Sequence, residues 1–286
     1  MFVAVLFIPV VAGNVFMESS FRRVPEITER QHKPRKTYML FDPCNTNKPG
    51  NQMVSCSHIR RKKNSTSGKF EIYPLDSPVN VTCDMTSDGG GWTVIQRRTS
   101  EEDKEYLFEK EPKDYERGFQ TKGGGLWIGN DILHALTSFP NNQQALRIEL
   151  KRKGATETTV VLYNKFHVGS KEENYKLTID KFHGPKGTDY DALSYHSGEK
   201  FTIKKSMTGS PDGDSCSPRL SGGWWFKACN KANLNGRNFK NPSSTRALGI
   251  TWYIKDNNES YKYIYDRVEM KIRDADFGFC MGSLKS

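Results

Sequence analysis

Short segments in which apolar and polar residues alternate recur along the middle of this chain, separated by Gly, Asn and Asp. The side chains of a strand point alternately to its two faces, so this alternation predicts strands with one buried and one exposed face. Such strands are typical of antiparallel sheets, and an antiparallel sheet therefore forms the centre of the predicted fold. The segments are residues 69–74, 79–85, 92–98, 145–151, 158–164 and 175–180, with a final run at Val268, Met270 and Ile272.

Two segments between the strands are expected to be helical. In NDILHALT, residues 130–137, the large apolar residues fall on one helical face, and Asn130 or Asp131 provides an N-cap. The charged segment 101–119 favours a helix up to Pro112. Helices that accompany antiparallel strands indicate the α+β class.

The region from Gly184 to Asn258 is rich in Gly, Ser, Asn and Lys and has few long strand patterns, so an irregular C-terminal region is expected. Its most distinctive stretch is SGGWWFKACNKANLNG, residues 221–236, which we call the ledge. Neighbouring residues of a strand face opposite sides. One indole of the Trp224–Trp225 pair can therefore be buried while the other points elsewhere, and at least one of the two is expected in the core.

The first residues form an apolar stretch, Phe2–Ala12, that ends in small residues. Although no Lys or Arg precedes it, the stretch fits a secretory signal with cleavage after Gly13. It is too short for a membrane anchor, and the polar residues that follow disfavour a buried strand. We therefore expect a signal peptide at residues 1–13, a polar linker with several prolines at 14–50, and one folded domain at 51–286.

The cysteines and the glycosylation sequons indicate the same extracellular location. Six cysteines occur without a C-x-x-C pair or a Cys/His metal spacing, which predicts disulfides formed in an oxidising compartment. N-x-S/T sequons begin at Asn64, Asn80 and Asn258. We therefore expect a secreted glycoprotein without a transmembrane segment.

The chain carries a formal net charge of +10. Outside the cell, the acidic partners that such a charge attracts are sulfated polysaccharides and anionic cell surfaces, rather than nucleic acid. A basic cluster is also typical of an ordinary solvated surface. The densest cluster, and therefore the candidate polyanion-binding site, comprises Arg60, Arg61, Lys62 and Lys63.

Common catalytic motifs are absent from the sequence, which contains no G-x-S-x-G, no H-E-x-x-H and no phosphate-binding loop. The histidines have no spacing that is typical of a catalytic triad or a metal site. We therefore expect a binding protein and not an enzyme.

Five motifs occur in the order that is found in fibrinogen C-terminal-like domains, and the chain resembles this family from about Cys56 to Arg273. The resemblance implies a small N-terminal subdomain, a central twisted antiparallel sheet with short helices, and an irregular, loop-rich C-terminal subdomain that binds ligands. The motifs are VTCDMTSDGGGWTVIQRR (81–98), GGLWIGNDILHALT (124–137), DALSYHSGEKF (191–201), GGWWFKACNKANLNG (222–236) and VEMKIR (268–273).

The resemblance also implies how the cysteines pair, which their number alone leaves open. It pairs Cys56 with Cys83, and Cys216 with Cys229 across the ledge. The two remaining cysteines, Cys44 and Cys280, lie outside the core motifs. We favour a bridge between them within one chain, and the alternative is a bridge between chains.

In the family members that bind acetylated sugars, the backbone N–H groups of the second bridge cysteine and of the next residue meet the ligand beside a cis peptide bond. The corresponding donors here belong to Cys229 and Asn230. Three side chains depart from that pattern: Leu220 and Arg246 stand in place of Tyr, and Asn230 in place of His. They favour an anionic or polar ligand over an acetylated sugar. The candidate ligand site comprises Leu220, Phe226, Ala228, Cys229, Asn230 and Arg246.

Calcium is the only cofactor that the resemblance implies. The acidic positions of the family's calcium loop carry Lys205 and Met207, and neither suits a hard cation. Asp212 and Asp214 form a shifted acidic pair in SPDGDSC and are the candidate replacement ligands. An acidic pair in such a loop is also typical of a solvated turn.

Two functions are compatible with this resemblance. The first is a secreted lectin-like protein of innate defence that binds glycans or pathogen surfaces through its C-terminal subdomain. The alternative is an angiopoietin-like signalling protein that binds a cell-surface receptor or heparan sulfate in the matrix. It is supported by the motif GGWWF, which is closer to the angiopoietin-type sequence than to the ficolin-type sequence GAWWY. The linker has neither heptads nor a Gly-X-Y repeat, so no oligomerisation stalk is visible, and the oligomeric state stays open.

Overall fold

The computed structural model of the chain describes residues 27–28, 37–38, 44, 52–139, 142–206 and 213–282. The expected signal peptide and most of the expected linker lie outside these residues. Among the described residues, the alternating segments form one nine-stranded antiparallel sheet with short helices around it, which confirms the α+β class. Its strands are β3 (Gly68–Ile72), β4 (Val79–Asp84), β5 (Trp92–Thr99), β6 (Phe119–Gln120), β7 (Leu126–Trp127), β8 (Gln144–Arg152), β9 (Thr159–Val168), β10 (Leu177–His183) and β15 (Tyr265–Asp274).

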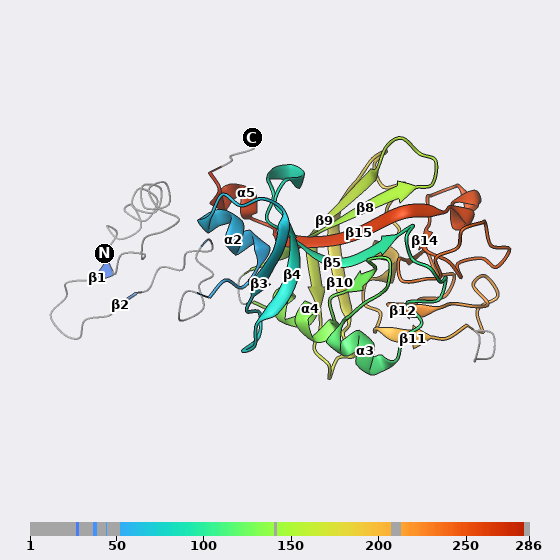
Figure 1. Cartoon of the computed structure of the whole chain (residues 1–286), viewed down its shortest axis with the longest axis horizontal. Coiled ribbons are helices and arrows are strands. Elements are labelled where there is room, and N and C mark those ends of the chain that lie inside the picture. The colour runs from blue at the N-terminus through green and yellow to red at the C-terminus, as the bar shows by residue number, and fades with distance from the viewer. Residues whose placement is uncertain are drawn as a thin grey trace, which may run out of the picture.

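The order of the strands differs from their order in the sequence. The main path across the sheet is β10-β9-β8-β15-β5-β4-β3, with β7 paired to β5 and β6 paired to β7. The strand that comes last in the sequence, β15, therefore lies between β8 and β5, and Figure 1 shows it running through the middle of the domain. A separate pair of two-residue strands, β1 (Ile27–Thr28) and β2 (Thr37–Tyr38), precedes the sheet in the sequence.

The central sheet has one apolar face and one charged face. Residues that pair across two strands share a face. On the apolar face, buried residues of β15 pair with buried residues of β8: Val268 with Leu150, Met270 with Ile148, and Ile272 with Leu146. On the other face, the alternate residues of the same two strands are charged: Arg267 pairs with Lys151, Glu269 with Glu149, and Lys271 with Arg147.

One expected helix forms at its predicted position, but its N-cap differs. α4 (Asn130–Thr137) packs against β9. Its N-cap is Gly129, which has a φ of 104°, so neither Asn130 nor Asp131 is the cap. Glycine adopts this positive φ without strain, so the cap falls on Gly129, and Asn130 and Asp131 belong to the first turn of the helix.

The helix expected before Pro112 is wrong. Residues 101–109 form turns, and α3 (Pro112–Arg117) begins at the proline instead. Proline suits the first position of a helix, where its missing N–H group is not needed. The carboxylate of Asp114 completes the cap by accepting a hydrogen bond from the N–H group of Glu111 at 3.1 Å.

A further short helix, α2 (Cys56–Lys62), was not expected from the sequence. The hydroxyl of Ser55 caps it by accepting a hydrogen bond from the N–H group of His58 at 3.2 Å. Across the described ranges, no helix has both the length and the apolar character needed to cross a membrane.

The C-terminal region is irregular, as expected, and contains two small sheets. In one, β11 (Thr202–Lys204) pairs with β12 (Gly222–Trp224), and in the other, β13 (Ala232–Asn233) pairs with β14 (Thr251–Trp252). Both Trp224 and Trp225 are fully buried, which confirms that at least one indole lies in the core and shows that neither points to the surface. Other elements cover both sides of β12, and the two rings pack with centroids 5.2 Å apart.

The six cysteines, all of them among the described residues, form three disulfides: Cys44–Cys280, Cys56–Cys83 and Cys216–Cys229. The second and third are the pairs that the resemblance implies, and the first is the bridge within one chain that we favoured over a bridge between chains. In Figure 1, α2 and α5 (Phe277–Cys280) lie at one end of the domain, and β11, β12 and β14 lie at the other. The first bridge therefore joins Cys44 to the end that is remote from the ledge.

Candidate functional site

Side-chain amides fix the backbone of the ledge. Asn233 and Asn235 are buried and donate hydrogen bonds to the carbonyl groups of Ser221 and Gly223, each at 2.9 Å. Gly222 has a φ of 83°, and a Cβ atom there would lie 2.3 Å from the carbonyl oxygen of Asn235. Only glycine therefore fits at this position, and β12 is held against the segment that follows β13.

A buried histidine holds the loop between β12 and β13. Nδ1 of His196 donates a hydrogen bond to the carbonyl of Trp225 at 2.7 Å, because a carbonyl oxygen only accepts. Nε2 accepts the backbone N–H groups of Lys231 at 3.2 Å and Ala232 at 2.9 Å. Burial, together with the nearby Lys227 and Lys231, lowers the pKa of His196 to about 4, so the imidazole is neutral at physiological pH.

The N–H group of Cys229, the expected ligand donor, is already occupied. Cys229 has a φ of 53°, and its N–H group donates a hydrogen bond to Oδ2 of Asp214 at 2.6 Å. Oδ1 of the same carboxylate accepts the N–H group of Cys216 at 2.9 Å. Desolvation raises the pKa of Asp214, but these backbone donors outweigh it and lower the pKa below its usual range. Asp214 is therefore an anion that binds both cysteines of the bridge.

The other expected ligand residues divide between the core and the surface. Leu220 and Asn230 are buried, and the amide nitrogen of Asn230 donates to the carbonyl of Ala232 at 3.0 Å. Phe226 is half-buried against the core. Ala228 is exposed, and its carbonyl accepts the hydroxyl of Tyr195 at 2.6 Å. Leu220 and Asn230 are therefore buried beneath the surface of the ledge.

Arg246 lies directly against the bridge. Its Nη1 atom donates a hydrogen bond to the carbonyl of Cys216 at 2.8 Å. Its guanidinium carbon lies 3.8 Å from the centre of the Tyr261 ring, a stacking contact between a cation and an aromatic face. Among the expected ligand residues, the structure therefore brings Ala228, Cys229 and Arg246 together around one disulfide.

Tyrosine rings and cations continue outward from Arg246 around the ledge. The rings of Tyr261 and Tyr253 have centroids 5.2 Å apart. Nζ of Lys231 lies 5.6 Å from the centre of the Tyr253 ring and 4.5 Å from that of Tyr195. Nζ of Lys227 lies 4.8 Å from the centre of the Tyr195 ring. We call these six side chains the tyrosine–cation ridge: Tyr195, Lys227, Lys231, Arg246, Tyr253 and Tyr261.

Sequence reasoning found only Arg246 of this ridge. Tyr195 and Tyr261 lie in separate 3₁₀ helices, η2 (Ser194–His196) and η3 (Asn258–Lys262), and Tyr253 follows β14, so no local pattern brings the three together. The alternation of Lys and Tyr in YKY, residues 261–263, is the one sequence signal near the site. Burial raises the pKa of Tyr261 to about 12, so its phenol stays neutral despite the nearby Arg246.

The described residues around the bridge do not by themselves provide the ligands of a calcium ion. Asp212 lies outside the described residues, so the expected acidic pair is not complete here. The ligand atoms that gather within 4.8 Å of one another belong to Asp214, Cys216 and Cys229. Both sulfurs belong to the disulfide, and a hard cation prefers six to eight oxygen ligands. One carboxylate that already accepts two N–H groups does not provide them.

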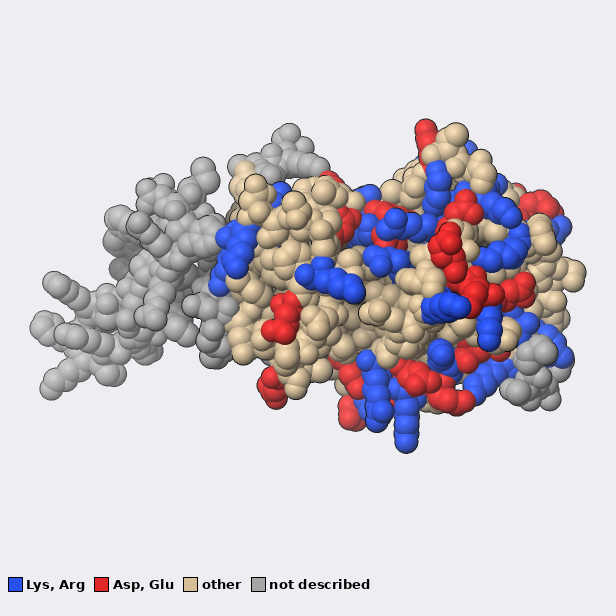
Figure 2. Space-filling view, viewed as in Figure 1, with Lys and Arg blue, Asp and Glu red and all other residues tan. Residues whose placement is uncertain are grey.

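The expected polyanion cluster is only partly on the surface. Arg61 is buried and pairs with Asp274 at 2.6 Å, so its charge does not face solvent. Arg60 and Lys62 are half-buried and Lys63 is exposed. Figure 2 shows basic atoms over α2, with the basic side chains elsewhere on that face interspersed with acidic ones. The cluster is therefore smaller than the sequence suggests.

All three sequon asparagines are on the surface. Asn64, Asn80 and Asn258 are each exposed, and Asn80 lies on β4. Exposure is a requirement for an N-linked glycan, so the three positions remain candidates for glycosylation.

Comparison with known proteins identifies the family of this chain. The family described as fibrinogen beta and gamma chains, C-terminal globular domain, matches residues 52–275. The chain belongs to this family. Fibrinogen-like domains are typically binding modules without catalytic activity.

Two curated relatives share about a third of their residues with this fibrinogen-like domain. Ryncolin-4 of Cerberus rynchops is 34% identical over 227 residues, which cover 78% of this chain and 61% of the relative. Angiopoietin-related protein 7 of Bos taurus is 34% identical over 234 residues, which cover 79% of this chain and 63% of the relative. The chain therefore spans less than two thirds of the length of each of these relatives.

Solved structures share the same fold. The fibrinogen-like globe domain of human ANGPTL6 matches with a TM-score of 0.66 and 27% identity, over 80% of this chain and 99% of that one. The corresponding domain of human ANGPTL2 matches with a TM-score of 0.65 and 27% identity, over 78% and 99% of the two chains. Lamprey fibrin D-dimer, complexed with a Gly-His-Arg-Pro-amide peptide, matches with a TM-score of 0.61 and 22% identity, over 83% and 78%.

Proposed function

We propose that this chain is a secreted, non-enzymatic recognition protein whose tyrosine–cation ridge binds acidic glycans, or glycoproteins that carry them, on cell or pathogen surfaces. The ridge itself carries the proposal, because three cations lie against three tyrosine rings around one disulfide. A tyrosine ring offers an apolar face to a sugar ring, and a neighbouring cation attracts a carboxylate or sulfate group.

Recognition of an acetyl group is the less favoured mode. That mode requires the N–H group of Cys229 as a donor, and Asp214 already accepts this hydrogen at 2.6 Å. An acetyl oxygen would have to displace a charged acceptor, whose hydrogen bonds are stronger than those of a neutral one. Because the N–H group of Cys229 is already hydrogen-bonded, ligands that contact the side chains of the ridge are favoured.

A secreted location is part of the proposal. Three disulfides are typical of proteins that fold in an oxidising compartment. The apolar stretch Phe2–Ala12 and the three exposed sequon asparagines support the same location.

Replacing Lys231 with alanine tests the ridge. Its ammonium lies over two tyrosine rings, so we expect Lys231→Ala to weaken the binding of acidic glycans about ten-fold, the effect of one lost charge-assisted contact. A glycan array followed by titration of the best ligand measures the change. Lys122→Ala is the matched control, because Lys122 is exposed, carries the same charge, pairs with Asp103 and does not belong to the ridge. Equal affinities in the two variants would count against the ridge.

Replacing Asp214 separates the proposed mode from the acetyl mode. Asp214→Ala releases the N–H group of Cys229. If that donor binds acetyl groups, the variant gains affinity for N-acetylglucosamine, and an excess of this sugar displaces the protein from the array. Under our proposal, free N-acetylglucosamine competes with neither the wild type nor the variant.

A receptor-binding role, as in a signalling ligand, is the second candidate. It is supported by the 34% identity to angiopoietin-related protein 7 and by the likeness to the two human globe domains. Saturable binding to cells that survives enzymatic removal of their surface glycans would support this role. Loss of cell binding after that treatment would favour glycan recognition.

A further inference from the structure

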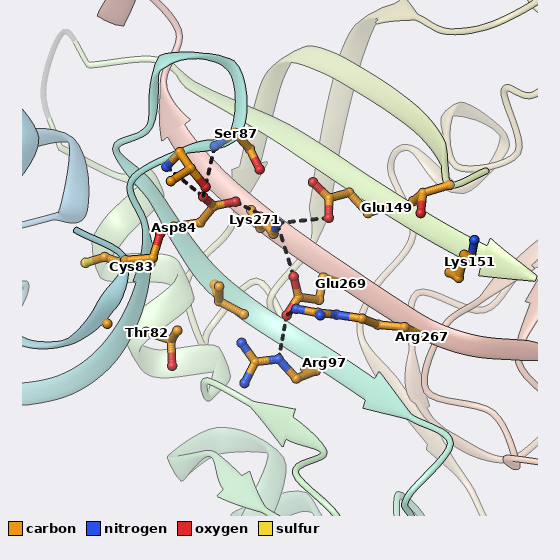
Figure 3. A pocket seen from close by; sticks show the side chains of 15 residues that line it. Thr82, Cys83, Asp84, Ser87, Arg97, Glu149, Lys151, Arg267, Glu269 and Lys271 are labelled. Carbon is orange, nitrogen blue, oxygen red and sulfur yellow. Dashed lines mark hydrogen bonds and ion pairs between the residues drawn. The ribbon is translucent and has the colours of Figure 1, made fainter. Parts of the chain in front are cut away.

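A second candidate site lies on the charged face of the central sheet, away from the ledge. A cavity of about 660 Å³ opens there between β3, β4, β5, β8 and β15, and Figure 3 shows the side chains that line it. This volume is within the range of small-ligand sites. We call this cavity the sheet groove. It shares no residue with the tyrosine–cation ridge.

A buried ion network forms the floor of the sheet groove. Lys271 lies at its centre in Figure 3, and its Nζ atom contacts three carboxylates: Asp84 at 2.8 Å, Glu149 at 2.9 Å and Glu269 at 3.1 Å. Burial lowers the pKa of Lys271, but these three carboxylates outweigh it and raise the pKa above its usual value. Burial likewise raises the pKa of Glu269, whereas Lys271, Arg267 and Arg97 lower it below its usual range. The floor therefore holds one cation among three carboxylates, and the guanidinium groups of Arg97 and Arg267 offset the remaining negative charge.

The cations at the rim of the sheet groove are more exposed than the acids below them. The side chains of Glu269, Asp84 and Glu149 are 1%, 13% and 18% exposed, whereas those of Arg97 and Arg267 are 24% and 59% exposed. Both guanidinium groups reach Glu269, through Nε of Arg97 at 2.5 Å and Nη2 of Arg267 at 2.7 Å. A ligand that approaches from solvent therefore meets cations before carboxylates.

The rim cations keep donors for a ligand. A guanidinium has five N–H donors. Within the described residues, neither Nη atom of Arg97 makes a hydrogen bond, and Figure 3 shows both of them on the side away from Glu269. Lys151 lines the same groove from β8, where its Nζ atom donates to the carbonyl of Thr156 at 2.5 Å and retains two further protons. In total, four cations but three carboxylates line the groove.

The remaining lining is rich in hydroxyl groups. Hydroxyl side chains can exchange hydrogen bonds with the hydroxyls of a sugar ring. No aromatic ring lines the groove among the residues that the structure describes, so a planar apolar ligand finds no stacking surface there. The hydroxyl residues are Ser67, Thr82, Thr86, Ser87 and Thr158.

We propose that the sheet groove is a second binding site, which takes an acidic saccharide. Arg97, Arg267 and Lys151 hold its sulfate or carboxylate group, and the surrounding Ser and Thr hydroxyls contact its ring. The paired carboxylates of the floor hold the two guanidinium groups in place and leave their outward donors to the ligand. The sheet groove and the ridge bind independently, because they come from different elements.

Binding of defined saccharides measured by isothermal titration calorimetry tests this site. The probes are a heparin-derived tetrasaccharide, 3′-sialyllactose, and the same tetrasaccharide after desulfation and carboxyl reduction. The parent protein carries Asn80→Gln, because Asn80 and the lining residue Thr82 lie two positions apart on β4 and therefore share a face. A glycan on Asn80 then cannot cover the groove.

Lys151 and Lys153 provide a matched pair of variants. Lys151 lines the groove, whereas Lys153 is an exposed lysine two residues later whose Nζ atom bonds the carbonyl of Lys240. We expect Lys151→Ala to weaken binding of an acidic probe about five- to ten-fold and Lys153→Ala to change it less than about two-fold. Thr158→Glu places a negative charge in the groove without touching the ion network, and we expect it to abolish binding.

Each outcome bears on the proposal. Binding of the tetrasaccharide alone identifies a sulfated ligand, and binding of sialyllactose alone identifies a carboxylate ligand. Binding that Lys231→Ala removes, and that Lys151→Ala and Thr158→Glu leave intact, overturns the sheet groove but leaves the ridge standing. The reverse pattern supports the groove and overturns the ridge, and two binding events, one lost in Lys231→Ala and the other in Lys151→Ala and Thr158→Glu, support both sites. Equal binding of the neutral probe, or no binding of either acidic probe, overturns the site proposed here.

Discussion

One buried imidazole holds the backbone of the ledge, and its pKa makes stability depend on pH. His196 has a pKa of about 4 in the folded protein, against about 6.5 for an ordinary histidine. As the pH falls below 6.5, the unfolded chain therefore binds a proton that the folded chain does not. We expect the free energy of unfolding to fall by about 2 kcal/mol from this residue between pH 7 and pH 5. Urea unfolding at the two pH values measures it.

Glutamine at this position provides the control. His196→Gln keeps one donor and one acceptor but does not titrate, so we expect its stability to fall less over the same pH range. His58 also has a pKa lowered to about 4, chiefly by burial, and its contribution is common to both proteins. The same pH dependence in the variant and the wild type would contradict a neutral, buried His196.

For individual residues, the sequence predicted the disulfide bonds better than the hydrogen bonds around them. The motif order implied the Cys216–Cys229 pair, which the structure contains. It did not predict that Asp214 accepts the N–H group of Cys229, fifteen residues later. That contact depends on the positive φ of Cys229 and on the path of a loop, and no periodic pattern encodes either.

A buried ion pair joins one strand of the sheet to the C-terminal subdomain. Arg98, near the end of β5, pairs with Glu102 at 2.8 Å, and both side chains are buried. Nη1 of Arg98 also donates to the carbonyls of Gly236 at 2.6 Å and Leu234 at 3.2 Å. The guanidinium therefore connects β5 to the end of the ledge.

Removing the carboxylate leaves that guanidinium buried without a counter-charge. We expect Glu102→Ala to lower the free energy of unfolding by about 3–5 kcal/mol, as measured by urea denaturation. Glu259→Ala is the control, because Glu259 is exposed and pairs with exposed Lys262, and we expect less than about 0.5 kcal/mol there. Similar losses in the two variants would contradict the buried position of Glu102.

The positions of the longer strands were predictable, whereas the start of a helix that depends on its cap was not. Apolar residues recur at every second position of segments 92–98 and 145–151, and these segments match β5 and β8 closely, although β5 is buried on both faces. The helix at 101–111 was wrong because Pro112 begins a helix rather than ending one. The burial of both Trp224 and Trp225 also escaped prediction, since alternation cannot reveal that a strand is covered on both sides.

Of the three disulfides, the Cys44–Cys280 bridge joins the two residues that are farthest apart in the sequence. Cys44 and Cys280 are 236 residues apart in the sequence. Because a crosslink restricts the unfolded chain, we expect the double variant Cys44→Ala, Cys280→Ala to lose about 3 kcal/mol of unfolding free energy. Chemical denaturation under oxidising conditions measures this loss. Unchanged stability, or free thiols at these positions in native material, would contradict the bridge.

The distribution of charge over the whole molecule was not visible in the sequence. The net charge of +10 drew attention to Arg60–Lys63, but Arg61 turns inward to Asp274. The three cations that the sheet groove offers to a ligand come from positions 97, 151 and 267, and only the strand order β8-β15-β5 brings them together. Composition therefore indicated an acidic partner, whereas the pairing of distant strands determines where it could bind.

The Cys44–Cys280 bridge also determines the end of the domain at which the molecule can be attached to a support or to another module. It fastens an early residue beside α5, at the pole opposite β11, β12 and β14 (Figure 1). A support or fused module attached to the backbone at Cys44 or at α5 is therefore held at the same end of the domain, with the disulfide intact. Copies arrayed in this way would present their ledges outward in a common orientation, a geometry in which weak individual contacts gain strength through simultaneous engagement.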